Sequence, residues 1–139
     1  EELNAGFLMR MRAGRPWVRV KLASSLDGRT ALANGLSQWI SGEASRADVQ
    51  RWRARSCAIL TGIGTVLADD PALTARLNGE ALQPLRVVAD TQWRTPPHCR
   101  ILLNPATALV AGSRERTIPA ALTATGAAVT SLSQLVVLR

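Results

Sequence analysis

Short strand-like runs alternate with helical segments along this chain, and this alternation strongly limits the folds open to it. The run "WVRVKLASSL", residues 17–26, alternates apolar and polar side chains as a half-buried strand does. Further β-rich runs occupy residues 57–64, 84–90 and 107–112, followed by "AAVTSL" and "LVVL". Strands separated by helices predict an α/β fold with a mostly parallel central sheet and helices on both faces, which makes three layers.

The firmest helical prediction lies in "SGEASRADVQRWRARS", residues 41–56. Ser41 is the candidate N-cap, Glu43 lies where the helix dipole favours an acid, and arginines gather where it favours a base. The pattern therefore predicts a helix over 43–55. A turn of helix in "TVLADDPAL", stopped by Pro71, and a helix starting near Pro119 are also expected.

The arginines of this helix allow two interpretations. Arg46, Val49 and Arg53 share one face at spacings of three and four residues, which would turn Arg53 along the protein. The alternative is a solvated cationic face that serves only solubility. Trp39, just before the helix, has an equally plain interpretation as a half-buried ring at the edge of the core.

Composition excludes several classes of function. With 139 residues, 47% of them apolar, the chain fits one globular domain. It has no apolar run long enough for a membrane span and no signal-peptide core, so a cytoplasmic location is expected. Its two cysteines, Cys57 and Cys99, and its single histidine, His98, make a disulfide framework, a metal site or a Ser-His-Asp triad improbable.

The charge balance favours an anionic partner. There are 17 basic and 10 acidic residues, which gives a net charge of +7. A nucleic acid is disfavoured because the chain has no Tyr and its scattered arginines form no basic block. Arginine binds phosphate with two hydrogen bonds at once, so a small phosphorylated ligand or cofactor explains the bias at least as well.

In parallel α/β sheets ligands bind at the carboxyl ends of the strands, so the loops after the predicted strands are candidates for a site. These loops carry small, hydroxyl or amide side chains at residues 24–28, 61–65, 90–92 and 112–113. Gly62 and Gly64 would let backbone N–H groups approach a phosphate. A tight strand-to-helix turn is the simpler explanation of the two glycines, since the third glycine of a dinucleotide motif is missing.

Several of these stretches together resemble one family. The pieces "RPWVRVKLASSLDGRTA", "SQWIS", "DVQRWRA" and "GTVLADDPALTAR" occur in the order found in the reductase domain of the bifunctional riboflavin-biosynthesis deaminase/reductase. "LRVVADTQWRTPP" extends the match. The resemblance implies a dihydrofolate-reductase-like fold and NADPH-dependent reduction of 5-amino-6-(5-phosphoribosylamino)uracil to its ribitylamino product.

The resemblance also assigns roles to individual residues. It implies that substrate is contacted by Ser37, Arg53, Leu73 and Arg76. It implies that NADPH is contacted by Ala23, Trp39, Thr65, Asp69 and Thr91.

Three residues are candidates for a catalytic role. Lys21, on the polar side of the first predicted strand, would polarise the substrate. Asp69 and Asp27 are the carboxylates available to pass a proton, and the residues do not decide between them.

The same family predicts what else would accompany this chain. Residues 1–16 are expected to be a linker from a missing N-terminal zinc deaminase domain, and residues 17–139 a partial reductase domain. No Gly-rich "EGGPT"-like turn is present after "SLSQLVVLR", so the domain is expected to be C-terminally truncated. A homodimer is expected. The alternatives are a noncatalytic fragment or oligomerisation module of the same fold and, less favoured, a basic nucleic-acid-binding domain.

Overall fold

The computed structural model describes residues 4–77 and 82–131. The chain divides into two compact units, one up to Arg46 and one from Ala47 onward. The first unit contains helix α1 (Ala5–Ala13) and a long irregular segment that leads to α2 (Glu43–Ala54). The second unit contains the rest of α2 and the sheet.

The second unit is built on four parallel strands in the order β1-β2-β3-β4. They are β1 (Ala58–Gly62), β2 (Leu85–Ala89), β3 (Ala108–Gly112) and β4 (Ala128–Ser131). The register places Thr61 opposite Val88, Val88 opposite Val110 and Val110 opposite Val129. These strands match the runs predicted at 57–64, 84–90 and 107–112 and in "AAVTSL". The α/β, dihydrofolate-reductase-like fold with a parallel sheet is confirmed; "LVVL" lies outside the described residues.

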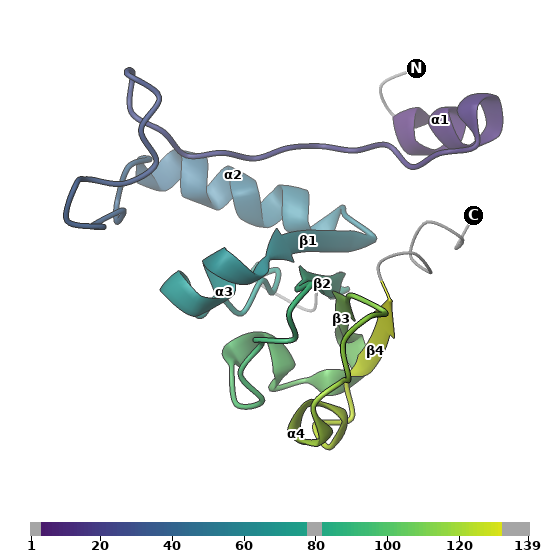
Figure 1. Ribbon diagram of the computed structural model, residues 1–139. Helices are drawn as coiled ribbons and strands as arrows, with labels where there is room; N and C mark the ends of the chain where they lie inside the picture. The colour runs from purple at the N-terminus through teal and green to yellow at the C-terminus, as the bar shows by residue number, and fades with distance from the viewer. Residues whose placement is uncertain (1–3, 78–81, 132–139) are drawn as a thin grey trace. The chain divides into compact units, whose positions relative to one another are not determined.

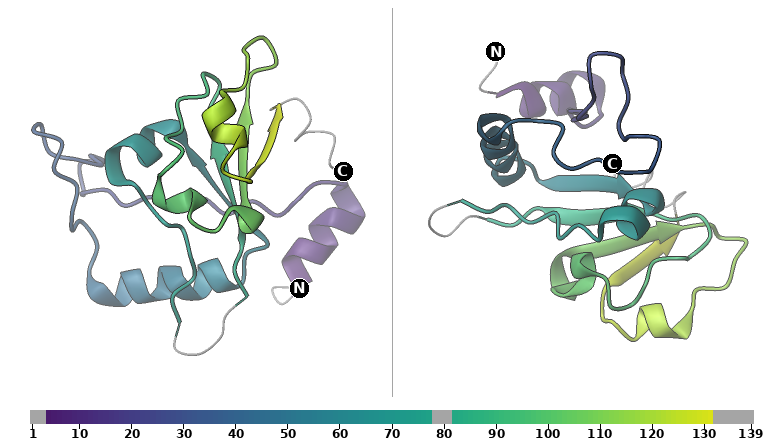
Figure 2. Two further views of the ribbon diagram at one scale, coloured as in Figure 1. Left: turned by 90° about the horizontal axis from the view of Figure 1, so that it is seen from below. Right: turned by 90° about the vertical axis from the view of Figure 1, so that its left-hand side faces the viewer.

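Helices lie on both sides of this sheet. Figures 1 and 2 show α2 on one side and α4 (Ala120–Thr123) on the other, together with the 3-10 turns η2 (Arg100–Leu102) and η3 (Pro105–Thr107). Helix α3 (Ile63–Asp69) follows β1 directly and contacts β1 and β2. The predicted helices over 43–55 and before Pro71 are confirmed, and the one near Pro119 is confirmed as a single short turn.

The core lies on the face of the sheet that carries α3, η2 and α4. It contains apolar side chains from all of these elements: Val66, Leu73, Val88, Trp93, Cys99, Ile101, Leu102, Ala108, Val110, Leu122 and Ala127. Burying this apolar surface is the main force that holds the layers together. Strand β3 is buried at every residue, as expected for a strand inside a parallel sheet.

Two local predictions were wrong. Residues 17–26 form no strand but an extended segment in which Val18, Val20 and Leu22 are exposed; alternation marks a face, but a strand also needs a hydrogen-bonded neighbour. Helix α1 lies within residues 1–16, whose assignment as a linker segment stays a prediction. Helix α2 begins at Glu43, so its cap position is Gly42 rather than Ser41.

Candidate functional site

Three candidate cofactor residues lie at the carboxyl ends of neighbouring strands. Thr65 and Asp69 are exposed on α3, which follows β1, and their four-residue spacing places them on one side of that helix. Thr91 is exposed directly after β2. Because β1 and β2 are adjacent and parallel, all three follow the same edge of the sheet, where α/β proteins bind ligands.

Helix α2 turns Arg53 toward the segment after α3. The half-buried residues of α2 are Arg46, Val49, Gln50, Arg53 and Ala54, which is one helical face and confirms the predicted pattern. The Nη1 of Arg53 donates to the Thr74 carbonyl oxygen at 3.2 Å. Burial, followed by the like charge of Arg76, lowers the pKa of Arg53. Arg53 is therefore not part of a merely solvated face.

The candidate substrate residues of the second unit meet around residues 73–76. Gln50 Oε1 accepts a hydrogen bond from the backbone N–H of Arg76 at 3.0 Å, and the Arg76 side chain is exposed. Arg53 and Arg76 are thus brought together. Leu73 differs, because its side chain is only 8% exposed within the core. A ligand would therefore reach Leu73 through its main chain.

Asp90, at the end of β2, organises the loop that carries Thr91. Its fully buried carboxylate accepts hydrogen bonds at 2.7 Å from both the backbone N–H and the hydroxyl of Thr95. The backbone N–H of Asp90 donates to the Ala111 carbonyl on the next strand. These bonds make Asp90 a structural residue that holds Thr91 in place.

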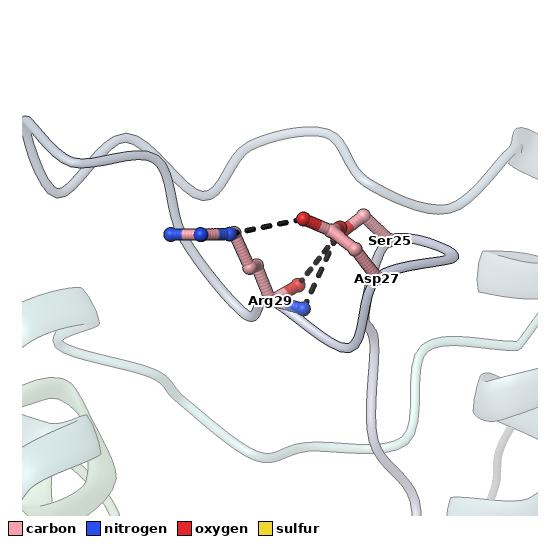
Figure 3. Close-up of polar contacts among 3 residues, drawn as sticks. All are labelled: Ser25, Asp27 and Arg29. Carbon is pink, nitrogen blue, oxygen red and sulfur yellow. Dashed lines mark hydrogen bonds and ion pairs between the residues drawn. The ribbon is translucent and has the colours of Figure 1, made fainter.

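In the first unit, residues 25–29 form a compact turn (Figure 3). Ser25 donates to one carboxylate oxygen of Asp27, and Arg29 Nε donates to the other at 2.9 Å. The hydrogen bond from Ser25, followed by that from Arg29, lowers the pKa of Asp27. Gly28, with φ of 78°, closes the turn. The loop expected at residues 24–28 therefore does contain a turn.

The remaining candidates of the first unit lie on its irregular segment. Trp39 is 72% exposed, so the interpretation as a half-buried ring is wrong. The guanidinium carbon of Arg46 lies 4.6 Å from the centre of that ring, within cation–π range. Ser37 and Ala23 are half-buried, and Lys21 is exposed.

Sequence reasoning missed a cavity at the carboxyl ends of β3 and β4. Its volume is about 280 Å³, and it is lined by Trp93, Ser113, Arg114, Arg116, Ile118, Val129, Thr130 and Ser131. The sequence pattern predicts small or hydroxyl groups in the loop at residues 112–113 but no cavity. The inward position of Trp93 depends on the turn after Asp90, which residue pattern alone did not reveal.

The described residues offer neither a helix that could cross a membrane nor a cluster that could hold a metal ion. Within residues 4–77 and 82–131, no helix has the length and hydrophobicity needed to cross a membrane. The same residues contain no group of three His, Cys, Asp or Glu side chains that could hold a metal ion. Cys57 is exposed and Cys99 buried, and both are free thiols.

A parallel sheet with hydroxyl and guanidinium groups along its carboxyl edge defines an α/β protein suited to phosphorylated ligands. The sequence model of the RibD C-terminal domain matches residues 16–135. The chain belongs to this family.

Relatives and solved structures agree with this assignment. The riboflavin biosynthesis protein RibD of Escherichia coli K12 is 50% identical over 127 residues, covering 83% of this chain and 35% of that protein. RibD of Mycobacterium tuberculosis H37Rv is 49% identical over 122 residues, covering 83% of this chain and 36% of that protein. This chain thus spans about a third of the length of these relatives.

Two solved structures share the fold. Acinetobacter baumannii RibD aligns with a TM-score of 0.83 at 45% identity, covering 96% of this chain and 39% of that one. A Thermotoga maritima protein, titled a diaminohydroxyphosphoribosylaminopyrimidine deaminase/5-amino-6-(5-phosphoribosylamino)uracil reductase, aligns with a TM-score of 0.76 at 33% identity, covering 96% and 37%.

Proposed function

We propose that this chain is the reductase part of a riboflavin-biosynthesis enzyme and uses NADPH to reduce 5-amino-6-(5-phosphoribosylamino)uracil to its ribitylamino product. The observation that carries the proposal is the membership of residues 16–135 in the RibD C-terminal family. Two groups of side chains at the sheet support it. Arg53 and Arg76 meet at the segment after α3, and Thr65, Asp69 and Thr91 follow one edge of the sheet.

The arginine pair would bind the substrate phosphate. Arg53 donates to the Thr74 carbonyl with one nitrogen of a planar fork that carries five donors, so donors remain for a phosphate oxygen. The partial burial and the like charge that lower the pKa of Arg53 would both favour an arriving anion. Arg76, held at its backbone by Gln50, would supply the second charge. Ser37 and the main chain of Leu73 are proposed to complete the contacts.

The donor set at the sheet edge fits a dinucleotide. NADPH, when bound, would supply the hydride that converts the imine carbon of the ring-opened sugar to an amine. Thr65 and Thr91 would hold the cofactor through their exposed hydroxyls. Trp39 is proposed as a further cofactor contact, because its exposed ring is a flat apolar surface. Ala23 is proposed as a further cofactor contact, Asp69 as both a contact and a proton carrier, and Lys21 as the polarising group.

The wider setting is also a proposal. The family relatives are much longer than this chain, which supports an N-terminal deaminase domain in the parent protein, joined through residues 1–16, with residues 17–139 forming the reductase domain. A homodimer is proposed, and the cytoplasm is proposed as the location, in agreement with two free thiols.

Substitution of Arg53 tests the substrate site. We expect Arg53→Ala to raise the substrate KM, or the dissociation constant measured by calorimetry, by at least about tenfold, because a charge-assisted phosphate contact is lost. The affinity for NADPH should change much less. Arg51→Ala is the matched control, since Arg51 is exposed on the same helix and pairs only with Asp48 among the described residues. An unchanged substrate affinity in Arg53→Ala would remove Arg53 from the phosphate site.

The noncatalytic alternative makes a different prediction. A fragment that served only assembly would self-associate but bind neither NADPH nor substrate in the same titrations. A nucleic-acid-binding domain would instead bind an oligonucleotide with an affinity that falls steeply with salt.

A further inference from the structure

Asp70 lies between two groups of residues to which the proposed function assigns ligands. Asp69, directly before it, ends α3 and is a proposed cofactor contact. Leu73 and Arg76, after it, are proposed substrate contacts. We propose that Asp70 is a positioning residue, which fixes both groups through one hydrogen bond to the start of η2. The inference rests on the proposed function and adds to it a residue that itself touches neither ligand.

The backbone of Asp70 turns the chain out of α3. Asp70 has left-handed dihedral angles, φ of 40° and ψ of 57°, and its N–H donates to the Val66 carbonyl oxygen at 3.0 Å, which closes the helix. Pro71 then prevents the helix from continuing. Leu73 is a second left-handed residue, with φ of 51°. Because residues other than glycine keep this conformation only where their surroundings hold them, the segment 70–76 needs contacts that fix its path.

The side chain of Asp70 supplies such a contact. Its Oδ1 accepts a hydrogen bond from the backbone N–H of Arg100 at 2.8 Å. Arg100 is the first residue of η2, and the side chain of the N-cap residue Cys99 makes no capping hydrogen bond. Asp70 therefore caps η2 from another element. Ile101 and Leu102, the next residues of η2, are 0% and 5% exposed, so packing in the core holds the bonded N–H in a fixed position.

Helix α3 is short and mostly exposed. Of its seven residues only Val66 is buried, and Asp69 at its end is exposed. Side chains of α2 and of Gln83 bond to residues 74–76, at the far end of the segment. The hydrogen bond of Asp70 holds the near end, where the segment leaves α3. Loss of this bond should therefore weaken the cofactor and the substrate contacts together.

Two substitutions of Asp70 separate its hydrogen-bond acceptor from its charge. Asp70→Gly removes the acceptor and suits the left-handed backbone, whereas Asp70→Asn keeps an oxygen acceptor and also tolerates this backbone. The 139-residue chain is titrated by calorimetry with NADPH and with 5-amino-6-(5-phosphoribosylamino)uracil, at a temperature where every variant is folded. We expect Asp70→Gly to weaken both ligands about fivefold, the size expected for one exposed hydrogen bond. Asp70→Asn, with the same change of net charge, should stay within about twofold of the wild type.

The donor of the bond gives an independent test. Arg100→Pro removes the backbone N–H, and proline suits this position because it begins η2 and follows an extended residue, Cys99, with φ of −66° and ψ of 151°. Arg100→Ala is the matched control, since it removes the same side-chain charge but keeps the N–H. We expect Arg100→Pro to weaken both ligands as Asp70→Gly does, and Arg100→Ala to bind them like the wild type. In the double variant Asp70→Gly/Arg100→Pro the loss should not exceed that of either single variant, because both remove the same bond.

Three outcomes would overturn the inference. One is wild-type affinity of Asp70→Gly for either ligand, which would show that the bond does not position both groups. Another is an equal loss in Asp70→Asn and Asp70→Gly, which would assign the effect to the charge of Asp70. The third is additive loss in the double variant, or equal loss in the two Arg100 variants, because the effect would then not act through this bond.

Failure of the proposed function can be separated from these outcomes. A wild-type chain that binds both ligands, with Asp70→Gly unchanged, would keep the proposed function and lose only the inference. A wild-type chain that binds neither NADPH nor the substrate would overturn the proposed function, and the inference with it.

Discussion

At Gly112 the sheet and the loop after β2 are packed tightly against each other. A Cβ atom at this position would lie 2.5 Å from Cε2 and Cζ2 of Trp93 and 2.7 Å from the Asp90 carbonyl oxygen. Neither neighbour can move easily, because Asp90 is fully buried and Trp93 is only 6% exposed. The missing side chain of Gly112 therefore sets the position of the indole that lines the cavity.

We expect Gly112→Ala to lower the free energy of unfolding by about 2 kcal/mol through overpacking against Trp93. Urea denaturation followed by tryptophan fluorescence measures this change. Gly64→Ala is the control, since a Cβ there meets nothing within 4 Å and alanine favours a helix. Equal stability of the two variants would contradict the role given to Gly112.

The carboxylate of Asp27 holds the turn of residues 25–29. Its protonation can be followed separately from that of the other acids by NMR. Because its pKa is lowered by Ser25 and Arg29 in the folded chain, its stabilising effect is complete above the unfolded pKa and is lost as the pH falls through the folded pKa. We expect NMR titration of Asp27 to give a midpoint below the ordinary aspartate value. Arg29→Ala should raise that midpoint, and Arg19→Ala, in the extended segment, should leave it unchanged.

At the scale of elements, side chains from two directions hold the segment that presents Arg76. Gln50 and Arg53 reach it from α2. Gln83 makes a pair of hydrogen bonds with the backbone N–H and C=O of Ala75, at 2.9 and 3.0 Å. The segment has no regular secondary structure of its own. These side-chain bonds therefore replace the backbone hydrogen bonds that a neighbouring strand would provide.

We expect Gln50→Ala to lower the free energy of unfolding by about 1 kcal/mol and to speed hydrogen exchange at the Arg76 amide, which loses its acceptor. Ser45→Ala, at an exposed position of the same helix, should change neither. If the Arg76 amide proton exchanged at the wild-type rate in Gln50→Ala, the contact with Gln50 of α2 would not hold the segment in place.

The helices and strands differed in how well they could be predicted from the sequence. The strands of the sheet could be predicted because burial in a parallel sheet leaves short continuous apolar runs, as in β3. The face of α2 followed from residue spacing. Residues 17–26 were predicted wrongly, because a strand and an unpaired extended segment can show the same alternation of apolar and polar side chains. The sequence pattern does not show whether a partner strand lies beside the segment. For the site, single residues such as Arg53 were recognisable, whereas the cavity at Trp93 depends on loop geometry.

At the scale of the whole molecule, β1 is an outer strand of the sheet, with no strand paired to its outer side among residues 4–77 and 82–131. Leu60, in the middle of β1, is 68% exposed. An exposed edge strand with an apolar side chain is a template for pairing with another chain. This edge therefore supports the proposed self-association, while the net charge of +7 opposes it at low salt.

We expect sedimentation velocity to show a dimer fraction that grows with protein concentration and with salt, since salt screens the repulsion. Leu60→Lys should shift the association constant by about tenfold toward monomer, because it adds a charge to the pairing edge. Leu103→Lys introduces the same change at a side chain that is 75% exposed but lies outside the sheet, and it should dimerise like the wild type. Equal weakening by both variants would mean that added charge alone controls association, and a monomer at every concentration and salt level would remove the β1 edge as an interface.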